Sequence, residues 1–182
     1  MFDENSVLVA VDMQNDFITG ALGTPRARII LERVCELAAT FPGDVVYTLD
    51  THDRDYLSTY EGTQLPIEHC IKGTQGWRVP DRLMKVLSER RAHAFEKSTF
   101  ASISLADALR DRHAKRPISA VELVGLCTDI CVVSCALLLR ATIPEVPLAV
   151  DASCCAGSDP QGHSAALKTM KSCQVLIRNA DR

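Results

Sequence analysis

Short apolar runs alternate with longer amphipathic stretches along most of the chain. Mainly apolar runs of roughly four to eight residues, bounded by polar or turn residues, are typical of strands buried on both faces. We predict such strands at residues 6–12, 44–50, 92–96, 118–125, 146–151 and 174–178. Apolar positions three or four residues apart predict helices at residues 26–40, 80–91, 103–113, 129–142 and 159–173.

Strands and helices that alternate in this way predict an α/β fold. We expect a three-layer α/β/α arrangement, in which a mostly parallel six-stranded sheet of the Rossmann-like kind lies between two layers of helices. The length of 182 residues and the apolar fraction of 47% suit a single domain that spans residues 1–182. No GxGxxG motif follows the first predicted strand, so a dinucleotide site has little support.

Composition narrows the choice of partner and compartment. A formal net charge of -3 without basic runs argues against nucleic acids and anionic membranes, and leaves small molecules or copies of the chain itself. No stretch approaches the roughly 20 apolar residues of a membrane span, and the N-terminal MFDENSVLVAVD is typical of a first strand, not of a signal peptide. Eight cysteines without a CxxC pair predict free thiols in a reducing, cytoplasmic setting.

Reactive side chains occur where predicted strands end. Asp12 ends the first strand, Lys97 follows the third, and Cys131 lies in the first turn of the helix after the fourth. Ligands bind at the carboxyl ends of such strands, and the positive end of a helix lowers the pKa of a thiol. We predict acyl transfer with Cys131 as nucleophile, Asp12 as proton shuttle and Lys97 as the stabilising cation. Each residue alone has an alternative interpretation, as a small buried residue, a loop cap and a surface charge respectively.

A second group of polar side chains lies in and just before the long segment 51–79. Asp50 and His52 are two residues apart in extended chain, so their side chains point to the same side. With Glu61 and His69 they would provide nitrogen and oxygen ligands, which suit zinc, iron or manganese better than calcium. We therefore expect a divalent metal site here, in a segment whose length already favours a functional role.

Three motifs follow one another along the chain: DMQNDF at residues 12–17, EKSTFASISL at residues 96–105 and GLCTDICV at residues 125–132. They resemble the motifs of the isochorismatase-like cysteine hydrolases, the family that contains the nicotinamidases, and the resemblance covers nearly the whole chain. It implies a catalytic triad of Asp12, Lys97 and Cys131. It also implies an oxyanion hole from the backbone N–H groups of Cys127 and Cys131, with a cis peptide bond between Leu126 and Cys127.

The metal-site segment is similar to that of nicotinamidases, in which an Asp-x-His pair precedes a His-Cys pair and a Gly-Thr turn. Asp50, His52 and His69 match that pattern, the last within HCIKGT at residues 69–74. Glu61 stands where some members add a carboxylate ligand, and Glu68 is a less favoured substitute. The resemblance thus implies a divalent ion, with zinc as the leading candidate and iron or manganese as alternatives.

The chain departs from the nicotinamidase pattern in the pocket. Nicotinamidases commonly place a Trp shortly before the metal-site His, whereas this chain has LPIEH at residues 65–69. An apolar side chain can still cover a ring face through dispersion and burial. We expect the substrate to contact Phe17, Leu65 and Trp77, with Tyr56 and Tyr60 as further candidate walls.

Together these features predict a cysteine amidohydrolase that forms a thioester on Cys131 and releases ammonia from a small carboxamide, with nicotinamide as the leading substrate. Two alternatives stay open: a metal-free hydrolase of another small amide or carbamoyl compound, and a non-catalytic binding member of the fold. Cys131 argues against the vinyl-ether hydrolases of the family, which often lack the nucleophile. The resemblance also implies a homo-oligomer, either a dimer or a tetramer.

Overall fold

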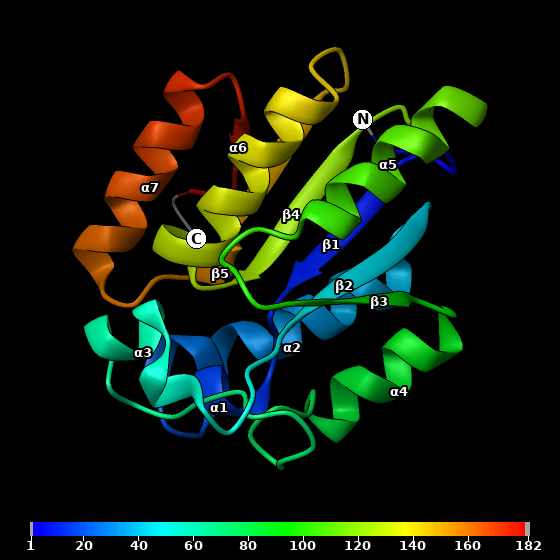
Figure 1. The fold of residues 1–182 in the computed structure, drawn as a ribbon. Helices are drawn as coiled ribbons and strands as arrows, with labels where there is room; N and C mark the ends of the chain where they lie inside the picture. The colour runs from blue at the N-terminus through cyan, green and yellow to red at the C-terminus, as the bar shows by residue number, and fades with distance from the viewer. Residues whose placement is uncertain (1, 181–182) are drawn as a thin grey trace.

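The computed structural model describes residues 2–180 and is organised around one six-stranded sheet (Figure 1). The strands lie in the order β3-β2-β1-β4-β5-β6, and every neighbouring pair is parallel. Their bounds are β1 Val7–Val11, β2 Asp44–Asp50, β3 His93–Lys97, β4 Val121–Leu126, β5 Leu148–Ala156 and β6 Leu176–Arg178. The predicted α/β class with a six-stranded parallel sheet is confirmed.

Helices cover both faces of this sheet, with α5, α6 and α7 on one side and α1, α2 and α4 on the other (Figure 1). Their bounds are α1 Asn15–Ile18, α2 Pro25–Thr40, α3 Tyr60–Gln64, α4 Asp81–Glu89, α5 Ile103–Lys115, α6 Val133–Thr142 and α7 Pro160–Ser172. Two single turns add to these, the 3₁₀ turn η1 at Tyr56–Ser58 and the π-helical turn η2 at Thr128–Val132. No helix within residues 2–180 is both long enough and apolar enough to cross a membrane.

The central strand β1 shows how the sequence makes two cores. Val7, Val9 and Val11 pack with the layer of α5, α6 and α7, while Leu8 and Ala10 pack with α2 and α4. All five residues are buried, as expected of a strand covered on both faces. Packing therefore occupies both faces of the sheet and leaves the strand ends free for ligands.

Most predicted bounds shift by a few residues or fewer, but three segments differ in kind. Strand β5 is predicted to end at Asp151 and instead continues to Ala156, because Asp151 is buried and satisfied by the Ser153 hydroxyl and the Asn179 amide. The helix expected at residues 129–142 is divided into η2 and α6. The long segment 51–79 contains η1 and α3.

Gly125 brings the end of β4 against the end of β1. Its φ of +119° lies outside the range that L side chains usually adopt, and an added Cβ would lie 2.1 Å from the carbonyl oxygen of Val11. Only glycine allows this approach. As a result, the turn that carries Cys131 starts beside Asp12 instead of diverging from it.

Candidate active site

The carboxyl ends of four neighbouring strands converge on one buried group of side chains. Asp12 follows β1, Asp50 and Lys97 end β2 and β3, and Cys131 lies in η2 after β4. The Lys97 ammonium is 2.7 Å from Asp12 Oδ2, 3.4 Å from Asp50 Oδ1 and 3.7 Å from Cys131 Sγ. The structure thus brings together the three residues for which a catalytic role is predicted, and adds a contact between Lys97 and the predicted metal site.

Cys131 lies in the π-helical turn that leads into α6, and the Leu126–Cys127 peptide bond before this turn is cis, as the resemblance implies. Burial raises the pKa of the Cys131 thiol well above its usual value, and Asp12 adds to the rise, whereas Lys97 opposes it. The expectation that a helix start lowers this pKa is therefore wrong. At rest Cys131 is a neutral thiol, which needs a base to become a nucleophile.

Asp12 is placed to be that base. Its side chain has no solvent exposure, and burial raises the pKa of the carboxyl while Lys97 and Thr48 lower it. Lys97 stays charged, because the neighbouring Asp12 and Asp50 outweigh the effect of burial and raise its pKa. A thiol, a carboxylate and an ammonium therefore share a dry pocket in which a proton can pass between sulfur and oxygen.

Two residues that fix this arrangement are missed by the sequence reasoning. Thr48 donates a hydrogen bond of 2.6 Å to Asp12 Oδ1 and accepts one of 3.1 Å from the Asp12 backbone N–H. Gln14 accepts from the backbone N–H of Asp50 and donates to the Asp50 and Trp77 carbonyls, each at 2.8 Å. The sequence does point to both, since each is an uncharged polar residue close to an acid at a strand end.

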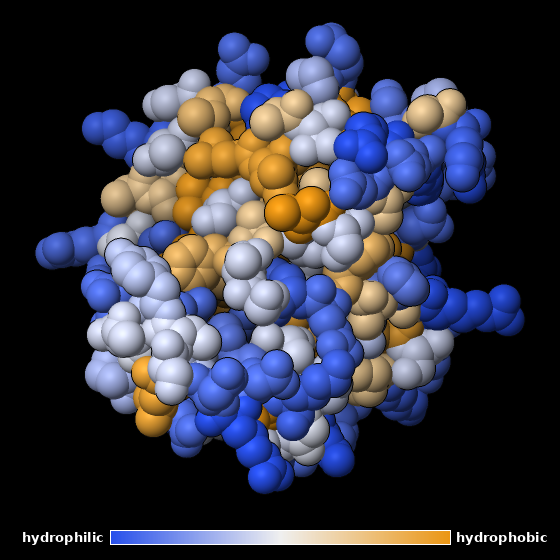
Figure 2. All heavy atoms as spheres, viewed as in Figure 1, coloured by the Kyte–Doolittle hydropathy of each residue, from blue (hydrophilic) through white to orange (hydrophobic). Residues whose placement is uncertain are grey.

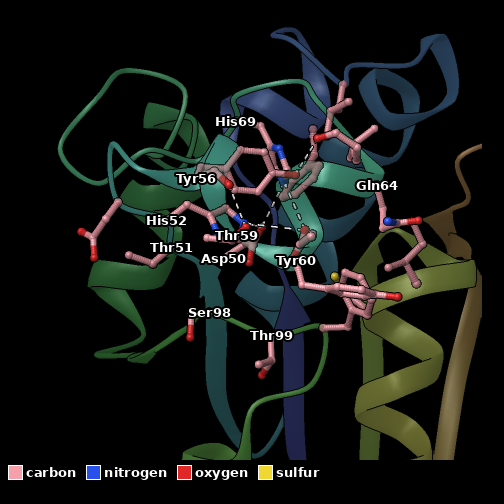
Figure 3. Close-up of a pocket in the computed structure, with 18 of the residues that line it drawn as sticks. Asp50, Thr51, His52, Tyr56, Thr59, Tyr60, Gln64, His69, Ser98 and Thr99 are labelled. Atoms are coloured by element: carbon pink, nitrogen blue, oxygen red, sulfur yellow. Dashed lines mark hydrogen bonds and ion pairs between the residues drawn. The ribbon is translucent and has the colours of Figure 1, made fainter.

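The predicted metal ligands also converge. Asp50 Oδ2 is 3.0 Å from His52 Nε2 and 3.5 Å from His69 Nε2, and the three ligand atoms lie within 4.8 Å of one another. Figure 3 shows these side chains pointing toward one another, with Tyr56 beside them. The Tyr56 ring centroid is 4.6 Å from that of His52 and 4.9 Å from that of His69, so an apolar wall lies against the group.

Surrounding contacts prepare these atoms for a cation. Because the Ile67 carbonyl can only accept, His69 Nδ1 carries the proton and donates to it at 2.8 Å. Nε2 is then unprotonated, and its lone pair faces Asp50. Glu61 Oε1 lies 3.8 Å from His52 Nε2 and 3.9 Å from His69 Nε2, whereas Glu68 is exposed. Burial and the nearby Asp50 raise the pKa of Glu61. Two imidazoles and two carboxylates with inward-facing atoms fit a divalent transition metal.

Both groups open into one cavity of about 870 Å³. Of the three residues expected to contact the substrate, Phe17 and Leu65 line this cavity and Trp77 does not. The Trp77 indole N–H donates to the Thr51 hydroxyl at 2.9 Å, and its ring packs against the core beneath. Within residues 2–180, the lining of this cavity contains neither Lys nor Arg but includes four acids, namely Asp50, Asp53, Asp55 and Glu61.

This arrangement is suited to acyl transfer on a small, uncharged molecule. Cys131 provides the attacking atom, Asp12 can accept and return a proton, and Lys97 offsets the negative charge of the two carboxylates. The Asp50, His52 and His69 group lies in the same cavity, beside the reacting atoms. It can therefore orient the molecule that Cys131 attacks.

Comparisons with known proteins agree with this description. The family model for the isochorismatase domain matches residues 6–181. An uncharacterized isochorismatase family protein PncA from Bacillus subtilis (strain 168) is 31% identical over 141 residues, which are 71% of this chain and 75% of that protein.

Solved structures extend the likeness. The nicotinamidase PncA from Bacillus subtilis is 28% identical with a TM-score of 0.81, over 96% of this chain and 99% of that one. The pyrazinamidase of Pyrococcus horikoshii, solved in complex with zinc, is 26% identical with a TM-score of 0.76, over 95% and 98% respectively.

Proposed function

Because the chain belongs to the isochorismatase family, we propose that it hydrolyses nicotinamide to nicotinate and ammonia through a thioester on Cys131. The chain is a hydrolase that acts on carbon–nitrogen bonds other than peptide bonds. One observation carries the finer proposal. The Lys97 ammonium lies within 3.7 Å of both Asp12 Oδ2 and Cys131 Sγ, in a cavity that also holds an Asp-His-His group.

The first half-reaction forms the thioester. Asp12 takes the proton from the Cys131 thiol, and the sulfur attacks the carboxamide carbon. The backbone N–H groups of Cys127 and Cys131 stabilise the negative charge that develops on the oxygen. Asp12 then gives its proton to the amide nitrogen, the carbon–nitrogen bond breaks, and ammonia leaves.

The second half-reaction returns the enzyme to its resting state. Asp12 takes a proton from a water molecule, whose oxygen attacks the thioester carbon. The carbon–sulfur bond breaks, the carboxylic acid forms and ionises, and the Cys131 sulfur is protonated again. Lys97 stays charged throughout, since Asp50 remains an ionised neighbour while Asp12 carries the proton, and Lys97 is not required as a proton donor.

Asp50, His52 and His69 would hold a divalent ion, with Glu61 as a candidate fourth ligand, and zinc is our leading assignment ahead of iron and manganese. The donor set of two imidazole nitrogens and carboxylate oxygens supports this choice. When bound, such an ion supplies a coordination position and a positive charge that orient the substrate. The residues of the chain carry the covalent chemistry.

The charge of the cavity favours nicotinamide over N-carbamoyl amino acids. The latter carry a carboxylate, which would meet four acids and no Lys or Arg among the described residues of the lining. Nicotinamide is neutral and flat, and Phe17 and Leu65 offer apolar surfaces for its ring. Another small neutral amide is the second candidate, because the Trp usual in nicotinamidases is replaced.

Two further expectations accompany this proposal. A homo-oligomer is expected, and apolar side chains gathered on the surface near α6 support a contact between copies (Figure 2). A reducing, cytoplasmic location is expected because all eight cysteines are free thiols. Light scattering in solution and localisation of a tagged chain test these two expectations.

Ammonia release tests the proposal. The panel contains nicotinamide, pyrazinamide, N-carbamoyl amino acids and aliphatic amides, with metal content measured on the same sample. We expect nicotinamide to be hydrolysed fastest. Cys131→Ala should abolish turnover, while the matched variant Cys135→Ala, one helical turn further on, should remain active. Trapping by mass spectrometry should find the acyl group on Cys131. An adduct on another cysteine, or full activity of Cys131→Ala, would refute the assignment.

A further inference from the structure

The cavity is far larger than a pyridine carboxamide requires. Its volume is about 870 Å³, whereas a cavity of roughly 150 Å³ holds a benzene ring. Cys131, His52 and His69 lie at its buried end and have little solvent exposure. A nicotinamide held there would leave most of the outer part of the cavity empty.

The outer part is lined by large apolar side chains that have no cover. Tyr60, the first residue of α3, is 84% exposed, and Phe100, which precedes α5, is 46% exposed, yet both line the cavity. Ile130 lines it beside Cys131. Figure 3 shows Tyr60 and Gln64 extending from α3 at the cavity, away from Ser98 and Thr99. Aromatic side chains at the mouth of a cavity are favourable contacts for a ligand that covers them.

Charge limits what can lie there. Asp53 and Asp55 line the cavity in addition to the acids of the metal group, and no Lys or Arg among the described lining residues balances them. An anionic ligand would be repelled, whereas an uncharged apolar group would gain contact with Tyr60 and Phe100.

We propose that the preferred substrate is an uncharged aromatic carboxamide whose ring carries a further apolar group of aromatic size, bound between Tyr60 and Phe100. This inference rests on the proposed amide hydrolysis. In a nicotinamide ring with its carboxamide at Cys131 and its nitrogen toward the divalent ion that Asp50, His52 and His69 would hold, carbon 2 would lie between these two positions. Carbon 5, on the opposite side of the ring, points away from both and is the natural site for the extension.

Three amides of graded shape and charge test this inference: nicotinamide, 5-phenylnicotinamide and 5-(4-carboxyphenyl)nicotinamide. We expect the phenyl group to raise kcat/KM about tenfold or more over nicotinamide, because it buries apolar surface. The carboxylate should remove that gain. Calorimetry on Cys131→Ala, which has no turnover, should show a lower dissociation constant for 5-phenylnicotinamide than for nicotinamide.

Variants of the rim make the test specific. Tyr60→Ala and Phe100→Ala should each lower the ratio of the two kcat/KM values, phenyl over unsubstituted, several-fold. Leu57→Ala is the matched control, since Leu57 is 49% exposed on the neighbouring turn η1 but does not line the cavity, and it should leave the ratio unchanged. Exposed side chains are replaced in all three, so folding is preserved.

The outcomes separate this inference from the function beneath it. Nicotinamide hydrolysed as well as or better than the phenyl derivative would overturn the inference and leave the amidase proposal standing. An unchanged ratio of the two kcat/KM values in both rim variants would do the same. So would a carboxyphenyl derivative that is hydrolysed as fast as the phenyl derivative. Failure to hydrolyse any of the three amides would overturn the proposed function itself.

Discussion

Replacing Thr48 by Val removes a hydroxyl that helps to fix the proposed base, without touching the nucleophile. The two side chains have nearly the same shape, but Val lacks the hydroxyl. In the native structure that hydroxyl donates to Asp12 Oδ1 at 2.6 Å and accepts from the Asp12 N–H at 3.1 Å. Thr48 is fully buried, so no water replaces it readily.

Both the stability and the rate should change by amounts that follow from these two contacts. Each buried group left without a partner costs about 1–3 kcal/mol, so for two groups we expect the free energy of unfolding to fall by about 2–6 kcal/mol. A domain near the middle of the usual range of about 5–15 kcal/mol survives that loss. If half of the loss also destabilises the transition state, kcat/KM falls about fivefold or more.

The pH–rate profile distinguishes positioning from simple loosening. The Thr48 hydrogen bond lowers the pKa of Asp12, so its removal raises that pKa and leaves less carboxylate at a given pH. The ascending limb of kcat/KM should therefore move to higher pH in Thr48→Val. Thr48→Ser, which keeps the hydroxyl, should restore the native profile. A profile that stays unchanged in Thr48→Val, or Ser as impaired as Val, would refute the role assigned to this hydroxyl.

Three other changes follow from the same geometry. Lys97→Met leaves buried carboxylates without their cation. We expect the free energy of unfolding, measured in urea, to fall by about 3–5 kcal/mol, and kcat, measured by ammonia release, to fall at least about a hundredfold. Near-native rates would make the lysine dispensable. Chelation or His52→Ala should raise KM for nicotinamide strongly but change the rate of Cys131 alkylation by iodoacetamide much less; equal loss of both would tie the metal to thiol activation. Burial raises the pKa of Glu122 to about 7, although Arg178 opposes the rise. Between about pH 4.5 and 7 the native state therefore keeps a proton that the unfolded chain has lost. The free energy of unfolding should fall by up to about 3 kcal/mol as the pH rises through that range. Glu122→Gln should flatten that slope in urea titrations, and a slope that persists would contradict this origin.

The parts of the fold that depend on local pattern can be predicted from the sequence. A run of apolar residues that stops at a polar one marks both a buried strand and its end, which is why the pattern alone puts Asp12, Asp50 and Lys97 at one edge of the sheet. Strand β5 is predicted too short for the same reason. Its polar residues Asp151 and Ser153 resemble a strand end, and only the complete fold shows that they are buried and paired.

The parts that depend on distant contacts cannot be predicted in this way. Trp77 is a reasonable pocket residue as a nearby aromatic side chain, but the path of a long segment determines which side chains face a cavity, and its indole packs beneath. The pKa of Cys131 is expected to fall on the basis of its place in a helix. Burial by all the surrounding helices and strands has the larger effect on this pKa and raises it. No single stretch of sequence shows how deeply the thiol is buried.

The acid-rich lining of the cavity also affects how the product leaves. A carboxamide enters without charge, but its hydrolysis leaves a carboxylate in a space bounded by four acidic side chains, more than the two charges of one divalent ion can neutralise. The product is therefore repelled by the same wall that admitted the substrate. Inhibition by accumulated acid should be weak, so the enzyme keeps its rate even where the corresponding acid is abundant.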